Sequence, residues 1–277
     1  MPYLRCSGSA GTLPHTWLRP SFVSALREDR PNSERRRLLR NLAQVATLAG
    51  RLAHEDLGDA LSGRAYYALA LDSAREADDH QAAAIALGQT AQLAHAEGMT
   101  TAAIGHLATA TAHADRARTV APWLAAIEAT LLADRGDHPA AREALHRANP
   151  TPSSRRPGQV PAPEYTAAHL AAVTGHLDLQ AADYAEARNA LGAALAQLPS
   201  TARRPRILAL VDLAFTELRA GHHPEACRHA TTAADQLGRT PYAAGTARLR
   251  AFRAAAATPL GPQALRVLDE YLSHLAA

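Results

Sequence analysis

The sequence predicts an all-α protein, a right-handed α–α superhelix of about six helix pairs. Three observations support this prediction: the chain is rich in alanine, a turn residue recurs about every forty residues, and the same apolar pattern follows each turn. Hydrophobic residues make up 47% of the 277 residues, but aromatic residues only 4%. Because alanine is the best helix former and strands favour β-branched and aromatic residues, this composition favours packed helices.

The charged residues narrow the function classes. All 29 basic residues are arginines, against 26 acidic residues. A chain without lysine lacks the group that Schiff-base enzymes and phosphate-binding P-loops use. Basic runs such as Arg35 to Arg37 are short and lack interleaved aromatic residues, so direct nucleic-acid binding is not expected. The two cysteines, Cys6 and Cys227, lie far apart in sequence and form no disulfide framework. No run of apolar residues approaches the length of a membrane span. We therefore expect a cytoplasmic protein without a membrane partner.

The repeat emerges when GDHPAAREAL at 136–145 is aligned with GHHPEACRHA at 221–230. Three further segments fit the same frame, at intervals of 40, 38, 46 and 39 residues. The turn residues of the frame are Gly58, Gly98, Gly136, Ala182 and Gly221. A glycine suits the end of one helix, and an aspartate or proline after it suits the start of the next, as in Gly136-Asp137-His138-Pro139. The Arg-Gly-Asp triplet at 135–137 is therefore interpreted as part of a helical hairpin.

The helices on either side of each turn share a pattern of small and bulky residues. Five positions after the turn come Gly63, Ala103, Ala141, Ala187 and Ala226. Nine positions after it come Tyr67, Leu107, Leu145, Leu191 and Ala230, and twelve after it Ala70, Ala110, Ala148, Ala194 and Ala233. Seven before it come Arg51, Ala91, Ala129, Gly175 and Ala214. Spacings of four and three place these residues on one helix face, where small side chains let two helices approach closely.

The frame places each element in order. Residues 1–32, rich in Pro, Gly and Ser, are expected to be irregular or partly disordered, and residues 33–277 to form the superhelix, with a Pro-rich inserted loop at 149–163. The predicted helix pairs are 35–78, 82–115, 121–148, 164–197 and 203–238, followed by a terminal pair at 241–256 and 262–276. Such pairs cannot bury an apolar face alone and must stack.

The small-bulky-small spacing resembles the tetratricopeptide repeat (TPR), lengthened beyond 34 residues and without the Trp and Tyr of that motif's first helix. RNLAQVATLAGRLAHEDLGDALSGRAYYALALDSAREADD at 40–79 and LALVDLAFTELRAGHHPEACRHATTAADQL at 208–237 are similar to the TPR-like region of bacterial Xre-type helix-turn-helix transcriptional regulators. The similarity extends over about residues 33–277 and implies a region that senses a ligand or partner. Only 32 residues precede Ser33, too few for the DNA-binding domain, so direct DNA binding does not carry over.

The TPR resemblance implies which residues would line a concave groove, at about 3, 6, 10 and 13 positions before each turn. The candidate ligand-binding residues are Glu55, Gln92, His95, Trp123, Thr130, His169, His176 and Phe215. The chain carries no catalytic or cofactor-binding signature, so no cofactor is expected and a non-enzymatic role is favoured. We therefore expect a regulatory or sensor protein that binds a peptide, a small molecule or a protein partner in this groove.

Two alternatives remain open at this stage. The first is a metal or general-base site formed by His95, His169 and His176 with Glu55, because three histidines can hold zinc with one position open. The chain would then be an enzyme built on a regulator-like fold. The protein could instead be an interaction scaffold or a homodimer, with an apolar patch on the C-terminal helix formed by Leu265, Leu268, Tyr271 and Leu272.

Overall fold

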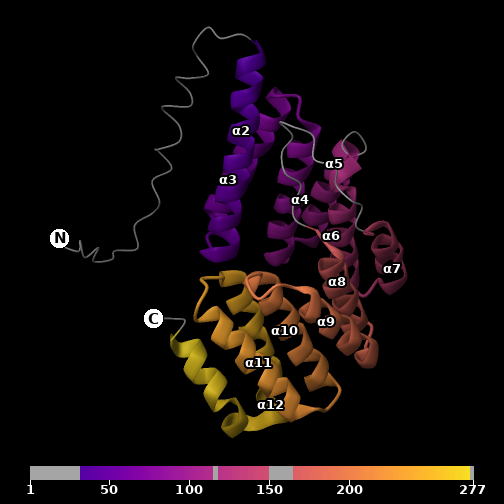
Figure 1. Cartoon of the computed structure of the whole chain (residues 1–277), viewed down its shortest axis with the longest axis vertical. Helices are drawn as coiled ribbons and strands as arrows, with labels where there is room; N and C mark the ends of the chain where they lie inside the picture. The colour runs from indigo at the N-terminus through magenta and orange to yellow at the C-terminus, as the bar shows by residue number, and fades with distance from the viewer. Residues whose placement is uncertain (1–31, 115–117, 150–164, 275–277) are drawn as a thin grey trace, which may run out of the picture.

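The computed structural model describes residues 32–114, 118–149 and 165–274. Within these ranges the chain is helical, with short turns and no strand (Figure 1). The α-helices are α2 (Asn32–Arg51), α3 (Ala60–Glu76), α4 (His80–Ala96), α5 (Thr100–Ala114), α6 (Ala121–Asp134), α7 (His138–Arg147), α8 (Ala167–Gln180), α9 (Tyr184–Gln197), α10 (Arg203–Arg219), α11 (His223–Leu237) and α12 (Ala243–His274). A π-helical turn, η1 (Leu52–Asp56), follows α2, and a 3₁₀ turn, η2 (Arg118–Val120), precedes α6. The all-α prediction is confirmed.

Consecutive helices pack as pairs: α2 with α3, α4 with α5, α6 with α7, α8 with α9 and α10 with α11. The long helix α12 bends at Gly261, which has a φ of 70°, and Arg253 before the bend forms a two-pronged ion pair with Asp269 after it, at 2.7 and 2.9 Å. The two arms of α12 thus correspond to the predicted terminal pair.

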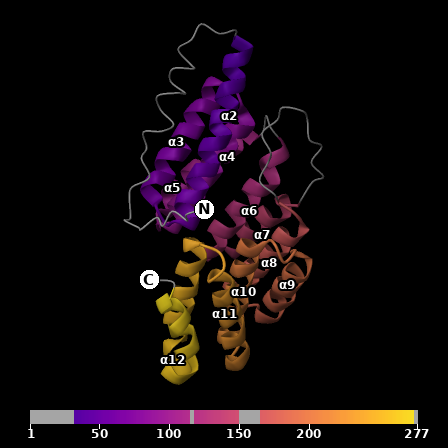
Figure 2. The ribbon, with the colours of Figure 1, turned by 60° about the vertical axis from the view of Figure 1, so that its left-hand side comes forward.

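The helices also pack in two layers. Each even-numbered helix from α2 to α12 contacts the next even-numbered helix, while the odd-numbered helices cover their outer side (Figures 1 and 2). The first pair meets the last, because η1 packs against α12 and Asp56 of η1 forms an ion pair with Arg204 at the start of α10. The even-numbered helices therefore share one side of the molecule, which we call the inner face.

The predicted turn frame is confirmed by the backbone. All five frame residues have positive φ values, from 63° at Ala182 to 83° at Gly221. Four of them are glycines, which adopt this conformation without a steric cost; Ala182 is the exception and is strained there. Two aspartates that follow the turns cap the next helix: the Asp59 carboxylate accepts the Ser62 N–H at 3.0 Å, and the Asp137 carboxylate accepts the Ala140 N–H at 3.3 Å. Asp183 makes no such bond to α9.

The predicted packing positions are also confirmed. The small residues five and twelve positions after each turn are buried in every repeat, and so are the bulky residues between them, apart from half-buried Leu145. Small residues on the first helix permit close packing: a Cβ atom on Gly175 would lie 2.5 Å from Cγ of Leu191. Alanine and glycine therefore set the distance between paired helices.

The exception at Arg51 has a structural cause. The π-helical turn η1 adds one residue to the first helix, so the small residue lies eight positions before Gly58 instead of seven. That residue is Gly50, where an added Cβ would lie 2.5 Å from Tyr67. The first repeat thus uses the same contact one residue earlier.

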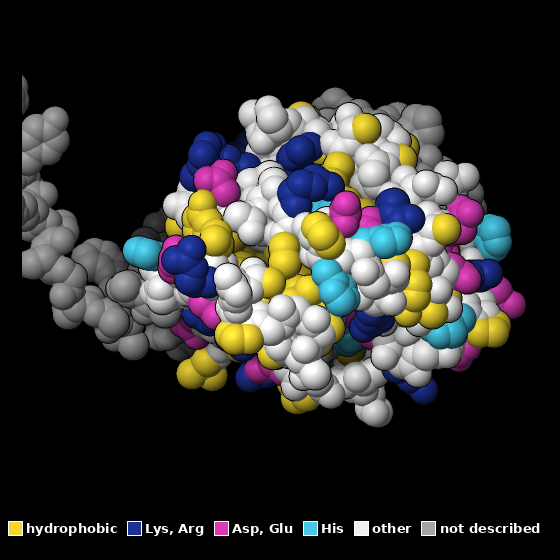
Figure 3. Space-filling model, turned by 90° about the horizontal axis from the view of Figure 1, so that it is seen from below, with side chains coloured by type: hydrophobic (Ala, Val, Ile, Leu, Met, Phe, Trp, Pro, Cys, Tyr) yellow, Lys and Arg dark blue, Asp and Glu magenta, His cyan; other side chains and the backbone are white. Residues whose placement is uncertain are grey.

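Two predicted segments fall almost wholly outside the described residues. These are the N-terminal segment 1–32, apart from Asn32 in α2, and the loop 149–163, apart from Asn149. Among the described helices, none combines the length and apolarity needed to cross a bilayer. Viewed from the end that carries α11 and α12, the surface mixes acidic, basic, histidine and apolar side chains without a field of one type (Figure 3).

Candidate ligand-binding face

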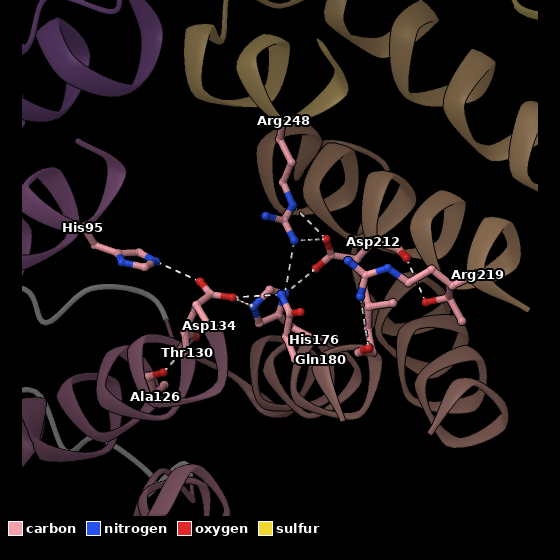
Figure 4. Close-up of polar contacts among 11 residues, drawn as sticks. His95, Ala126, Thr130, Asp134, His176, Gln180, Asp212, Arg219 and Arg248 are labelled. Atoms are coloured by element: carbon pink, nitrogen blue, oxygen red, sulfur yellow. Dashed lines mark hydrogen bonds and ion pairs between the residues drawn. The ribbon is translucent and has the colours of Figure 1, made fainter. Parts of the chain in front are cut away.

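Five polar side chains form a continuous chain of contacts across the inner face, one from each even-numbered helix from α4 to α12 (Figure 4). In order they are His95, Asp134, His176, Asp212 and Arg248, which we call the ladder. Neighbouring members lie 36 to 42 residues apart in sequence, close to the repeat length. The ladder therefore joins five repeats through charged groups.

His176 is the buried centre of the ladder. Its Nε2 lies 2.8 Å from Oδ1 of Asp134 and its Nδ1 lies 3.2 Å from Oδ2 of Asp212. Burial alone would lower the pKa of His176, but the hydrogen bonds to the two carboxylates outweigh burial and raise the pKa to about 9. At neutral pH both nitrogens carry protons and donate, one to each carboxylate.

Asp134, at the end of α6, connects His176 to His95. Its Oδ1 also accepts the amide of Gln180 at 2.9 Å, and its Oδ2 lies 2.8 Å from Nε2 of His95. Burial opposes ionisation of Asp134, but the hydrogen bonds from both histidines hold its pKa well below the usual range. Asp134 is therefore a carboxylate at any physiological pH.

Asp212 and Arg248 close the other end. The Arg248 guanidinium donates twice to Oδ1 of Asp212, from Nε at 2.7 Å and from Nη2. Burial opposes the charge on Asp212, but Arg248 and His176 together lower its pKa. Nη2 of Arg248 also lies 3.1 Å from Nδ1 of His176. Because both nitrogens are donors when His176 is charged, this approach is a repulsive contact that Asp212 compensates.

Phe215 lies one helical turn after Asp212 on α10 and borders the ladder. Its half-buried ring makes an edge-to-face contact with the fully buried Phe252, with centroids 5.4 Å apart. Two guanidinium groups approach the ring, that of Arg248 at 5.9 Å and that of Arg219 at 5.8 Å from its centroid. An aromatic surface with a cationic border thus lies beside the ladder.

Three further predicted residues lie on ladder helices. Gln92 is exposed on α4, one turn before His95. Thr130, one turn before Asp134 on α6, is half-buried, and its hydroxyl donates to the carbonyl of Ala126 at 3.1 Å. Trp123, nearer the start of α6, is half-buried over Gly88, where a Cβ would lie 2.6 Å from its ring.

The other two predicted residues lie apart from the ladder contacts. His169 is in the first turn of α8, where Nδ1 accepts the Thr166 N–H at 3.3 Å and contacts the Thr166 hydroxyl at 2.9 Å. Glu55 lies on η1, and its carboxylate is 3.5 Å from Nε of Arg51. Within the described part of the chain, no group of three or more His, Cys, Asp or Glu side chains is arranged to hold a metal ion. Of the four residues in the metal hypothesis, His95 and His176 share Asp134, whereas His169 contacts Thr166 and Glu55 contacts Arg51.

The apolar residues expected to form a patch on the C-terminal helix are part of the core instead. Leu265 and Leu268 are buried against Phe252 and Leu249, and Tyr271 and Leu272 pack on the same cluster. The bend at Gly261 turns the second arm of α12 back onto the first, so its apolar side faces inward. The expected patch was therefore wrong in its location.

Three ladder members were not predicted from sequence: Asp134, Asp212 and Arg248. One signal could have indicated Asp212, a lone carboxylate inside the apolar run ILALVDLAF, since a buried charge requires a partner. Its partners could not be found the same way, because Asp134 lies two residues before a turn and Arg248 follows the last turn of the frame.

The chemistry of the ladder suits positioning more than proton transfer. Both nitrogens of His176 face carboxylates, and Nδ1 of His95 is shielded from solvent without a hydrogen-bond partner. A general base needs a free nitrogen within reach of its substrate.

In comparisons with known proteins, no family model, no curated protein and no solved structure matches this chain.

Proposed function

We propose that this protein is a non-enzymatic, TPR-like regulatory or sensor protein. It binds a peptide, a small molecule or a protein partner along the concave side of a right-handed superhelix. The observation that carries this proposal is the ladder with its border of partly exposed groups: Gln92, Thr130 and Phe215 lie on the same helices as the ladder, within one turn of its members. Concave faces of helical-repeat proteins are their usual binding surfaces.

The ladder supports this role because it fixes the inner face before a partner arrives. Five helices are cross-linked by charged hydrogen bonds around His176, so the side chains at their border are held in place. A surface that is already ordered loses less conformational entropy on binding, and more of the contact energy remains as affinity.

The test is a selection of random twelve-residue peptides displayed on phage against the full chain. The best peptide is synthesised and titrated calorimetrically into the wild type, Gln92→Ala and Phe215→Ala. Thr109→Ala, an exposed residue of the outer helix α5, is the control. We expect about tenfold weaker binding for the inner-face variants and no change for the control, as for interface residues worth about 1–2 kcal/mol. A peptide whose affinity none of the inner-face variants changes would contradict the proposal.

A second candidate, a homodimer, is favoured by an apolar stripe that runs from α2 to the first residue of η1. Val45, Leu48 and Leu52 are 45%, 55% and 43% exposed, and their spacing puts them on one side of the helix. A two-fold axis at Leu48 would bring the stripes of two copies together.

Sedimentation equilibrium tests this candidate directly. The homodimer candidate predicts concentration-dependent self-association that Leu48→Asp abolishes and that Val267→Asp, at an exposed apolar residue of α12, leaves unchanged. A wild-type protein that stays monomeric at 100 micromolar, a concentration of the order at which weak dimers associate, would exclude it. The enzyme alternative is less well supported, because the free nitrogen of His95 is shielded from solvent.

A further inference from the structure

One positive charge on the inner face has no carboxylate partner. Within the ladder the charges compensate one another, since Asp134 and Asp212 face His176 and Arg248. Arg219, in the last turn of α10, is exposed and forms no ion pair among the described residues. Within the described part of the chain, its only hydrogen bond is a long one, 3.5 Å to the carbonyl oxygen of Leu179. The guanidinium of Arg219 is thus free to take a negative partner.

The neighbourhood of Arg219 defines what else that partner would contact. Phe215 lies one turn earlier on the same helix, and its ring is fixed from behind by Phe252. Arg248 approaches the same ring but is held to Asp212 by two hydrogen bonds. Of the two guanidinium groups at Phe215, one is anchored and one is available.

A surface arginine that lies on a phenylalanine is common and by itself indicates no ligand. The position of Arg219 distinguishes it from the exposed arginines of the outer helices. Its target ring contacts Arg248 of the ladder, and among the described residues the ladder supplies no carboxylate to Arg219. A planar guanidinium beside an aromatic surface matches a carboxylate joined to an apolar group.

We infer that the ligand of the inner face carries a carboxylate next to an aromatic or apolar group. Its carboxylate pairs with Arg219 and its apolar part covers Phe215. This inference rests on the proposed function, because it names the chemistry of the partner at that face. The shared chemistry fits an acidic peptide or a small aromatic acid.

The experiment uses two pairs of probes that differ only in charge: benzoate with benzamide, and N-acetylphenylalanine with its amide. Dissociation constants are measured by ligand-observed NMR on the full chain. We expect each acid to bind at least tenfold more tightly than its amide, because charge-assisted hydrogen bonds are roughly twice as strong as neutral ones. Arg219→Gln should remove that difference, while Arg250→Gln, an exposed arginine on α12, should keep it. Stronger binding of N-acetylphenylalanine than of benzoate indicates a peptide source, and the reverse indicates a small acid.

The inference is overturned if acids and amides bind alike, or if Arg250→Gln weakens the acids as much as Arg219→Gln does. Its failure is distinguishable from that of the proposed function. Selected peptides that depend on Phe215 but not on Arg219 would sustain the binding face and overturn the carboxylate. An acid that binds through Arg219, with no selected peptide bound to the inner face, would sustain the carboxylate and exclude the peptide as partner.

Discussion

Replacing His176 by leucine removes the central cation of the ladder and puts an apolar side chain of similar size in its place. The substitution leaves Asp134 and Asp212 without the proton donor between them. Loss of one partner from a buried charge pair typically costs about 3–5 kcal/mol, because the remaining charge stays desolvated. The rise of the His176 pKa from 6.5 to about 9 corresponds to a similar figure, about 3 kcal/mol. We expect a loss of about 3 kcal/mol at pH 6.5.

The same residue predicts a pH dependence with a definite sign. A histidine whose pKa is higher in the folded state stabilises fully below its unfolded pKa, and this contribution disappears as the pH rises through the folded pKa. For His176 the window runs from pH 6.5 to about 9. The wild type should therefore lose about 3 kcal/mol more than His176→Leu between pH 6.5 and 9.5.

Urea unfolding followed by circular dichroism measures both quantities. His106→Leu, at a half-buried histidine on the outer helix α5, is the control and should change little at either pH. The reasoning is refuted if His176→Leu is as stable as the wild type at pH 6.5, or if the difference between them is the same at pH 9.5.

Two further predictions concern the backbone frame. Ala182→Gly should raise the free energy of unfolding by about 1 kcal/mol, because glycine adopts a φ of 63° without strain. Ala181→Gly, at a φ of −77°, should lower that free energy by up to about 1 kcal/mol, and urea unfolding that shows changes of the same sign for both variants would contradict this account. Gly175→Ala should lower the free energy of unfolding by about 1–3 kcal/mol, because its Cβ would overlap Leu191, whereas Gly192→Ala on α9, with open space at its Cβ, should leave it unchanged or raise it. Equal shifts of the melting temperature for the two variants would contradict the packing account.

The repeat frame could be predicted from sequence because it is set by local physics. Each turn needs a residue at positive φ, and each helix pair needs small residues at fixed distances from that turn. Both requirements leave a periodic signal even in an alanine-rich chain. The π-helical turn at Leu52–Asp56 could not be predicted, since it is one inserted residue whose only trace is the displaced small position at Gly50.

The ladder could be predicted only in part because its members do not keep one position in the frame. His95 lies three residues before its turn, Asp134 two, His176 six and Asp212 nine. The contacts thus run diagonally across the helices, and a fixed set of groove positions selects His95 and His176 but not the carboxylates that join them. His169 satisfied the positional rule too, yet its ring is bonded to Thr166 at the start of α8.

Hydrogen–deuterium exchange of the full chain with and without the selected peptide tests the binding face most directly. The proposed function predicts that added protection is confined to the inner-face helices α4, α6, α8, α10 and α12. Protection confined to the outer helices α5, α7, α9 and α11, with none on the inner face, would contradict it.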